Sequence, residues 1–206
     1  MTYAEHGEDD ILAALFGDYV GYAVDVGAGD GRTINNTLLF EERGWDVLCV
    51  EANPLHHPAL LAARRRVATV AASDRDGRLL LHRYDRCGSP LATVGPLHPA
   101  MRARYAPQAV ETDAIEVPCL TLDTLLGIAG FPQVDLLSID VDGHELAVLN
   151  GFDIARWAPR AVLIEDTGID PGLVAYLDAF DYVPDSRIVK LGGFNDLWIA
   201  KGKSHA

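Results

Sequence analysis

The chain has 206 residues, of which 49% are hydrophobic and 23% are charged, an ordinary composition for a globular protein that can bury a core. Its formal net charge is −13, which argues against a nucleic acid as substrate, because binding a phosphate backbone needs a basic surface. No apolar run approaches the roughly 20 residues that span a bilayer, so we expect a single soluble domain with no membrane partner.

The start of the chain and its cysteines indicate the cytoplasm. The first ten residues are acidic and contain no apolar stretch, so we expect no signal peptide. Cys49, Cys87 and Cys119 are an odd number and lack the spacing of metal ligands. The oligomeric state stays open, and a homo-oligomer is permitted.

The hydrophobic pattern predicts helices and strands in alternation. The predicted helices are 8–16, 35–43, 55–66, one that starts at 121–126, one that ends at Leu149, and 173–180. The predicted strands are 22–26, 46–51, 67–72, 79–84, 115–119, 134–140, 160–166, 181–188 and 197–200. This alternation is typical of an α/β fold with a doubly wound sheet.

Two segments fall outside this pattern. Arg64, Arg65 and Arg66 end the predicted helix 55–66, where positive charge complements the helix dipole. Residues 85–114 contain four prolines and have no clear periodicity, apart from one short helix at 98–105. A loop of this length is usually functional, so we predict a lid or an insert on the substrate side.

The chain is organised around the strand 22–26 and the loop that follows it. Gly27, Gly29 and Gly31 allow the backbone to turn sharply and to approach a ligand closely. A strand, a glycine loop and a helix form the first half of a nucleotide-binding βαβ unit. The phosphate-binding form of this loop has glycine where Arg32 stands, and the loop here is acidic, with Asp25 before it and Asp30 inside it. Such a loop would repel a pyrophosphate and suits a cationic ligand.

The second predicted strand ends in Glu51, twenty residues after Gly31, and a carboxylate there can accept both hydroxyls of a ribose. S-adenosylmethionine (SAM) has a ribose, an ammonium and a sulfonium, and it has no phosphate. We therefore favour a methyl-donor site. An NAD-dependent Rossmann oxidoreductase and a non-catalytic binding module with the same fold are the alternatives.

In a doubly wound sheet, ligands bind at the carboxyl ends of the strands. That edge would collect the polar side chains of several strand ends, which are Asp25, Asp30, Glu51, Ser73, Asp74, Asp140, Asp142, His144, Glu165 and Asp166. A binding module without catalysis would have no need of so many acids at the strand ends.

Several blocks of the chain resemble FkbM-type SAM-dependent methyltransferases. They are Gly7-Glu8-Asp9, Tyr22 to Gly31, Asn36-Thr37, Gly44-Trp45, Val50 to Pro54, Thr121-Leu122-Asp123 and Val134 to Gly151. The resemblance implies the Rossmann-like class I methyltransferase fold, a doubly wound, mostly parallel sheet with an antiparallel C-terminal strand. It also implies O-methylation of a small-molecule acceptor such as a sugar or a polyketide-like metabolite. The family more often has Glu where Asp142 stands and Ser where Asn35 stands.

The resemblance also implies roles for individual residues. Gly27, Gly29 and Gly31 would pass the methionine part of SAM, and Glu51, followed by Ala52, would hold the ribose. Ser73 and Asp74 would flank the adenine. Asp140 would lie beside the methionine end and face the acceptor, which makes it a candidate catalytic residue as well.

An alcohol is a weak acid, so methyl transfer to its oxygen needs a base or a metal ion. His144 is the candidate base, because the unperturbed pKa of histidine is about 6.5. Alternatively, Asp140, Glu165 and Asp166 offer hard oxygen ligands for Mg²⁺. Sugar O-methyltransferases of the macrocin type use carboxylates with magnesium in a similar way. The two routes stay open at this point.

Overall fold

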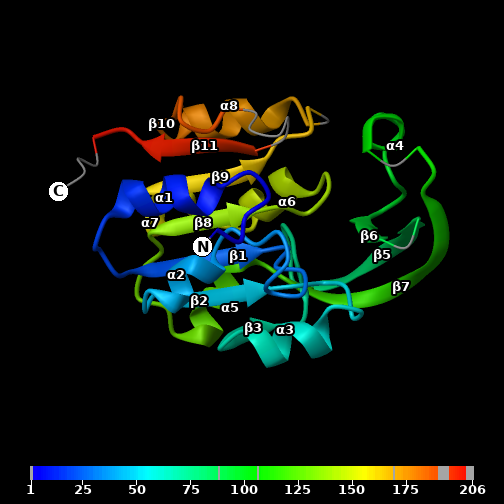
Figure 1. Ribbon diagram of the computed structural model, residues 1–206. Coiled ribbons are helices and arrows are strands. Elements are labelled where there is room, and N and C mark those ends of the chain that lie inside the picture. The colour runs from blue at the N-terminus through cyan, green and yellow to red at the C-terminus, as the bar shows by residue number, and fades with distance from the viewer. Residues whose placement is uncertain (1, 88, 106, 169, 190–194, 203–206) are drawn as a thin grey trace.

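A computed structural model describes residues 2–87, 89–105, 107–168, 170–189 and 195–202. Within these residues, the larger sheet has seven strands in the order β10-β11-β9-β8-β1-β2-β3 (Figure 1). Its strands are β1 (Tyr22–Val26), β2 (Asp46–Val50), β3 (Arg66–Ala68), β8 (Leu136–Ile139), β9 (Ala161–Glu165), β10 (Tyr182–Pro184) and β11 (Asn195–Ala200). The five strands from β3 through β2, β1 and β8 to β9 are parallel to one another, and β11 is antiparallel to both β9 and β10. The mixed α/β fold, its parallel-rich sheet and the antiparallel C-terminal strand are confirmed.

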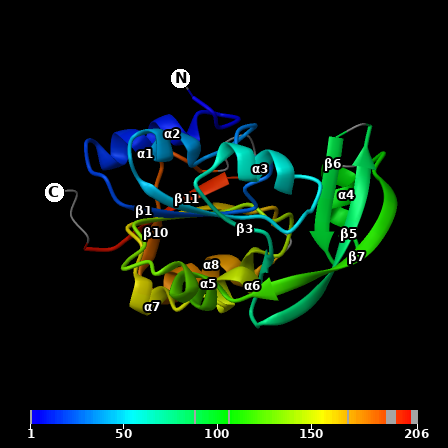
Figure 2. The same ribbon diagram turned by 90° about the horizontal axis from the view of Figure 1, so that it is seen from below.

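Helices cover both faces of this sheet (Figure 2). One face carries α1 (Glu8–Phe16), α2 (Leu38–Glu42) and α3 (His57–Ala63), and the other carries α5 (Leu122–Ala129), α6 (Glu145–Asn150), α7 (Ile154–Trp157) and α8 (Gly172–Ala179). Successive strand residues point to opposite faces. Accordingly Ala23 belongs to the core under α1 to α3, and Val24 belongs to the core under α5 to α8. Burial on both faces explains why the central strands are mostly apolar at successive positions in the sequence.

A second sheet stands beyond the carboxyl ends of the parallel strands (Figure 1). Its order is β4-β7-β5-β6, formed by β4 (Ala71–Ala72), β5 (Gly77–Arg86), β6 (Ser89–Val94) and β7 (Val110–Leu120), with α4 (Pro99–Tyr105) beside it. The predicted long loop at 85–114 was therefore wrong, whereas its short helix is confirmed as α4. Pro90 lies in β6, which pairs only with β5 among the described strands, and an edge strand tolerates proline. The role of this segment as a lid stays a prediction.

Several helix and strand boundaries also differ from the predictions, among them the predicted strand 181–188, which is β10 at Tyr182–Pro184. Helix α2 begins at Leu38 instead of residue 35, and the predicted strand 67–72 is divided between β3 and β4 in different sheets. Helix α3 ends at Ala63, where Arg64 turns to an extended backbone. The interpretation of Arg64 to Arg66 as the basic end of a helix was wrong for this reason. No helix in the described part of the chain is long and apolar enough to cross a membrane.

The side chain of Arg64 is fully buried and connects three elements beneath the glycine loop. Its Nε donates to Glu41 Oε2 over 2.8 Å, and its Nη1 lies 3.6 Å from Asp25 Oδ2. The guanidinium also donates to Asn35 Oδ1 over 2.9 Å and to Thr37 Oγ1 over 2.8 Å. Asn35 and Thr37 in turn donate to Asp25 Oδ2. One cation thus balances two buried carboxylates.

We predict that Arg64→Ala lowers the free energy of unfolding by about 3–5 kcal/mol, because it leaves the buried carboxylate of Asp25 without its cation and Glu41 with the exposed Arg65 alone. Urea denaturation measures this loss. Arg65→Ala is the matched control, since Arg65 also pairs with Glu41 but its side chain is 60% exposed. The control should lose about 1 kcal/mol or less, and equal losses in the two variants would contradict the prediction.

Candidate functional site

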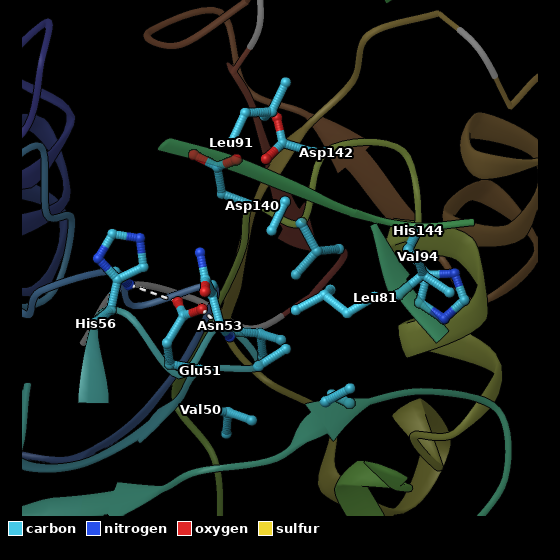
Figure 3. Close-up of a pocket in the computed structure, with 18 of the residues that line it drawn as sticks. Val50, Glu51, Asn53, His56, Leu81, Leu91, Val94, Asp140, Asp142 and His144 are labelled. Carbon is cyan, nitrogen blue, oxygen red and sulfur yellow. Dashed lines mark hydrogen bonds between the residues drawn. The ribbon is translucent and has the colours of Figure 1, made fainter. Parts of the chain in front are cut away.

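A cavity of about 240 Å³ lies at the carboxyl edge of the larger sheet, where the second sheet meets it (Figure 3). The loops after β1, β2 and β8 contribute Gly27, Gly29, Ile34, Glu51, Ala52, Asn53, His56, Asp140, Val141, Asp142 and His144. The second sheet contributes a largely apolar wall that includes Ala71, Ala72, Leu81, Pro90, Leu91, Ala92 and Val94. The cavity therefore occupies the place where doubly wound sheets bind ligands.

The glycines of the loop after β1 have different surroundings. Gly27 has a φ of +86°, and a Cβ there would lie 1.7 Å from the carbonyl oxygen of Asp140, so no other residue fits. Gly29 has a φ of +56° with open space where a Cβ would stand. A Cβ on Gly31 would meet Arg64 Cγ at 2.7 Å, on the side away from the cavity. Gly27 and Gly29 line the cavity, and Gly31 packs against α3.

Glu51 follows β2 directly and is 7% exposed. Its Oε2 accepts the backbone N–H of Gly29 over 2.8 Å, and its Oε1 accepts that of Asn53 over 2.6 Å. Burial raises the pKa of Glu51 in spite of these hydrogen bonds, which favour the ionised form. Each carboxylate oxygen keeps acceptor capacity for a ligand hydroxyl. Ala52, the next residue, also lines the cavity.

The two acids next to the glycines support the loop and do not line the cavity. Asp25 is bound within the buried Arg64 network described above. Asp30 accepts the backbone N–H groups of Arg32 over 2.8 Å and Thr33 over 2.7 Å. Burial opposes ionisation of Asp30, but the hydrogen bonds from Thr33 and Arg32 prevail and lower its pKa.

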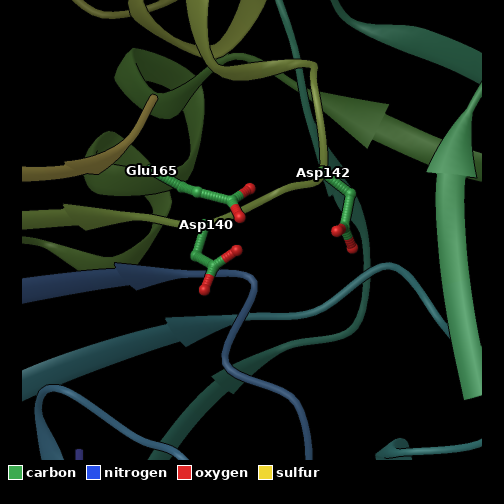
Figure 4. A group of neighbouring side chains, drawn as sticks. All are labelled: Asp140, Asp142 and Glu165. Atoms are coloured by element: carbon green, nitrogen blue, oxygen red, sulfur yellow. The ribbon is translucent and has the colours of Figure 1, made fainter. Parts of the chain in front are cut away.

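Three carboxyl groups converge beside the cavity, from Asp140, Asp142 and Glu165 (Figure 4). Oxygen atoms of the three lie within 4.8 Å of one another. The predicted set contained Asp166 in place of Asp142. Asp166 is half-buried and lies outside the group, because neighbouring residues at the end of a strand point to opposite sides. Its carboxylate accepts the backbone N–H of Gly168. Asp142 joins the group through a left-handed turn, with a φ of +55°.

Full ionisation of these three carboxyl groups would place three negative charges close together. Burial raises the pKa of Asp140 to about 6 and that of Glu165 to about 11, and in each case a neighbouring carboxylate adds to the shift. Burial and the charge of Asp140 raise the pKa of Asp142 well above its usual range. Among the described residues, Glu165 Oε2 is a buried oxygen without a hydrogen-bond partner. A cation would stabilise this arrangement.

His144 lies at the N-cap position of α6 and lines the cavity (Figure 3). Its Nε2 is 3.0 Å from Ser73 Oγ, which donates to Asp74 Oδ1 over 3.2 Å. Since Ser73 donates to Asp74, Nε2–H of His144 is the donor to Ser73, and Nδ1 is left as the proton acceptor. Burial lowers the pKa of His144, so its imidazole is neutral at pH 7. Ser73 and Asp74 are outside the residues that line the cavity, and their contact with adenine stays a prediction.

Sequence reasoning missed Asn53, His56 and the wall formed by the second sheet. Figure 3 shows Asn53 and His56 beside Glu51, and Leu81 and Val94 near His144. The position of His56 five residues after Glu51 was a usable signal, because short connections after a strand stay at the same edge. The alternation of Leu79 and Leu81 on one side of β5 could have revealed the apolar wall.

A family model, the methyltransferase FkbM domain, matches residues 25–184. The chain belongs to the FkbM methyltransferase family. The match extends from β1 to β10 and includes the cavity and the whole second sheet. A search of curated proteins found no match. The resemblance that the sequence blocks indicated is thereby confirmed, and membership of this family indicates a methyltransferase.

Proposed function

We propose that this FkbM-family protein is a SAM-dependent methyltransferase that transfers a methyl group to a hydroxyl of a small molecule, such as a sugar or a polyketide-like metabolite. The observation that carries the proposal is the acidic polar lining of the cavity, from Glu51, Asp140 and Asp142. Such a lining favours a cationic donor without phosphate. The strand order, with helices on both faces, supports the doubly wound class I arrangement.

In this proposal Glu51 accepts the ribose hydroxyls of SAM. Gly27 and Gly29 provide close backbone approach for the methionine part, and Asp140 lies beside its ammonium and faces the acceptor. The open space above Gly29 supports this placement, as does the position of Asp140 next to Gly27. Bound SAM supplies a methyl group on a positively charged sulfur.

We predict that Glu51→Ala weakens binding of S-adenosylhomocysteine (SAH) more than tenfold, a loss of about 1.4 kcal/mol or more, because two hydroxyl partners lose their acceptor. Isothermal titration calorimetry measures the affinity. Glu116→Ala is the control, since Glu116 is exposed on β7 and outside the cavity. Near-normal affinity of a folded Glu51→Ala protein would overturn the role of Glu51. Failure of the unmodified protein to bind SAH would overturn the proposed function itself.

The candidate base for the reaction is His144. The acceptor oxygen forms a bond to the methyl carbon as the carbon–sulfur bond breaks, and the hydroxyl proton passes to Nδ1 of His144. The chain from Nε2–H through Ser73 to Asp74 orients the ring and stabilises the imidazolium that forms. Much of the remaining acceleration comes from holding the two reacting atoms about 3 Å apart.

We predict that His144→Ala lowers kcat about 100-fold or more and leaves SAH affinity unchanged, because a general base acts on the acceptor alone. The measurement is SAH formation with an acceptor identified by screening. The lowered pKa of His144 keeps the base neutral into mildly acidic solution, so activity should fall only below the pH at which free histidine is protonated. Unchanged turnover would instead favour the metal route.

The carboxylate group of Asp140, Asp142 and Glu165 fits a divalent cation. Three hard oxygen donors within 4.8 Å and a buried, unpartnered oxygen of Glu165 support Mg²⁺ at this place. When bound, the ion would lower the pKa of an acceptor hydroxyl. We propose Mg²⁺ as the second candidate cofactor. Asp140, Asp142 and Glu165 would hold it, with Asp142 in place of the predicted Asp166.

We predict that the protein binds Mg²⁺ in calorimetry, that Asp142→Asn weakens this binding at least about tenfold, and that Asp166→Asn does not. Affinity should rise from pH 6 to pH 8, because carboxyls with raised pKa values must lose protons before they bind the ion. Absence of binding at millimolar Mg²⁺, or equal loss in the two variants, would exclude this site.

A further inference from the structure

Ile34 has a strained backbone conformation at the edge of the cavity. Its φ is +51°, in the left-handed region where a β-branched residue is a rare exception. The residue lines the cavity and is nevertheless 58% exposed, whereas Glu51 in the same cavity is 7% exposed. Ile34 therefore presents a large apolar side chain at the rim, where water covers most of it.

The neighbours of Ile34 impose this conformation. On one side, the backbone N–H of Thr33 donates to Asp30 over 2.7 Å. On the other side, the N–H of Asn35 donates to the carbonyl oxygen of Tyr3 over 3.1 Å, and the Asn35 side chain is buried in the Arg64 network. Strain of this kind persists where the surroundings determine it, and it occurs most often at binding sites. The loop thus holds Ile34 outward at a cost in stability.

The donor does not account for an apolar group at the rim. The adenine of the donor is assigned to Ser73 and Asp74, directly after β4. The other groups assigned to the donor, Gly29, Glu51 and Asp140, are backbone and carboxylate groups that suit hydroxyls and positive charge. Further apolar lining comes from Pro90, Leu91 and Val94 of the second sheet. A ligand that extends outward from the carboxylates would cover these side chains and Ile34 together, and burial of that apolar surface would offset the strain.

We propose that Ile34 is a specificity-determining residue of the acceptor subsite, and that the acceptor carries an apolar ring or chain next to the hydroxyl that is methylated. The inference rests on the proposed methyltransferase function and names the substrate class of that site. A free, fully hydrophilic sugar would leave Ile34 and the apolar wall without a partner, so a sugar acceptor would bear an apolar substituent.

Two probes with identical sugar hydroxyls test the acceptor class. Phenyl β-glucoside and methyl β-glucoside are titrated in calorimetry into the protein saturated with SAH. The phenyl compound should bind about tenfold more tightly, because its ring buries additional apolar surface. Equal affinities, including no measurable binding of either compound, would overturn the proposal. Failure of SAH itself to bind would count against the proposed function instead, so the two failures are distinguishable.

Ile34→Asn tests the residue, because asparagine adopts the left-handed conformation readily and removes the apolar group. We expect the preference for the phenyl compound to disappear, SAH affinity to change less than about twofold, and Tm to rise by about 2–6 °C as strain is released. Ile34→Gly should give the same pattern. Leu61→Asn is the matched control, since Leu61 is 59% exposed on α3 and outside the cavity, and it should keep the preference. An unchanged preference in the Ile34 variants, or a parallel loss of SAH affinity, would overturn the proposal.

Discussion

The buried guanidinium of Arg64 is the interaction on which the site depends. It connects the end of α3 with Glu41 of α2, with Asp25 of β1 and with the carbonyl oxygen of Gly31 in the glycine loop. A charge in a low-dielectric interior is stable only when its hydrogen-bonding capacity is satisfied, and these partners satisfy it. The same partners fix the course of the loop from Gly27 to Thr37. The network therefore determines where Gly29 and Ile34 lie relative to Glu51.

The distribution of positive charge follows from this arrangement. Arg64 compensates the negative charges of Asp25 and Glu41. Its remaining donors are directed to Asn35 and Thr37. Asp140, Asp142 and Glu165 form a separate group beside the cavity, and burial raises the pKa of all three, with the charge of Arg86 opposing the rise at Asp142. Asp25 and Glu41 thus have a structural role, whereas the group of Asp140, Asp142 and Glu165 is available to a cationic ligand.

The sequence alone predicted the position of a strand or a site residue correctly where a single physical signal determined that position. The strand 22–26 is apolar except for Asp25 and is bounded by glycine on both sides, and the structure has β1 at the same residues. Glu51 was located at the strand end for the same reason. By contrast, Arg64 looked like a helix terminus because charge at the end of a helix is ordinary, and its burial depends on partners more than twenty residues away in the sequence.

The choice between Asp142 and Asp166 as the third member of the carboxylate group also could not be made from local sequence patterns. Both follow a strand within a few residues, so spacing alone does not separate them. The left-handed turn at Asp142, next to Gly143 with a φ of +98°, decides which carboxyl joins the group. The second sheet was missed because β6 contains Pro90 and is an edge strand, and because β5 pairs with β7, which is far away in the sequence. Its prolines looked like loop residues in the absence of that partner.

The two walls of the cavity belong to different cores. Residues that contact the proposed donor are held by the larger sheet and the Arg64 network, whereas the apolar wall is held by the second sheet. That sheet has hydrophobic clusters of its own, one around Leu79, Leu81 and Val117 and another around Tyr84, Leu91 and Met101. Substitutions in one core need not disturb the other. In the proposed arrangement, the apolar wall on the acceptor side can therefore vary while the acidic edge on the donor side stays the same, and Ile34 is the point where the glycine loop itself contributes to the acceptor side.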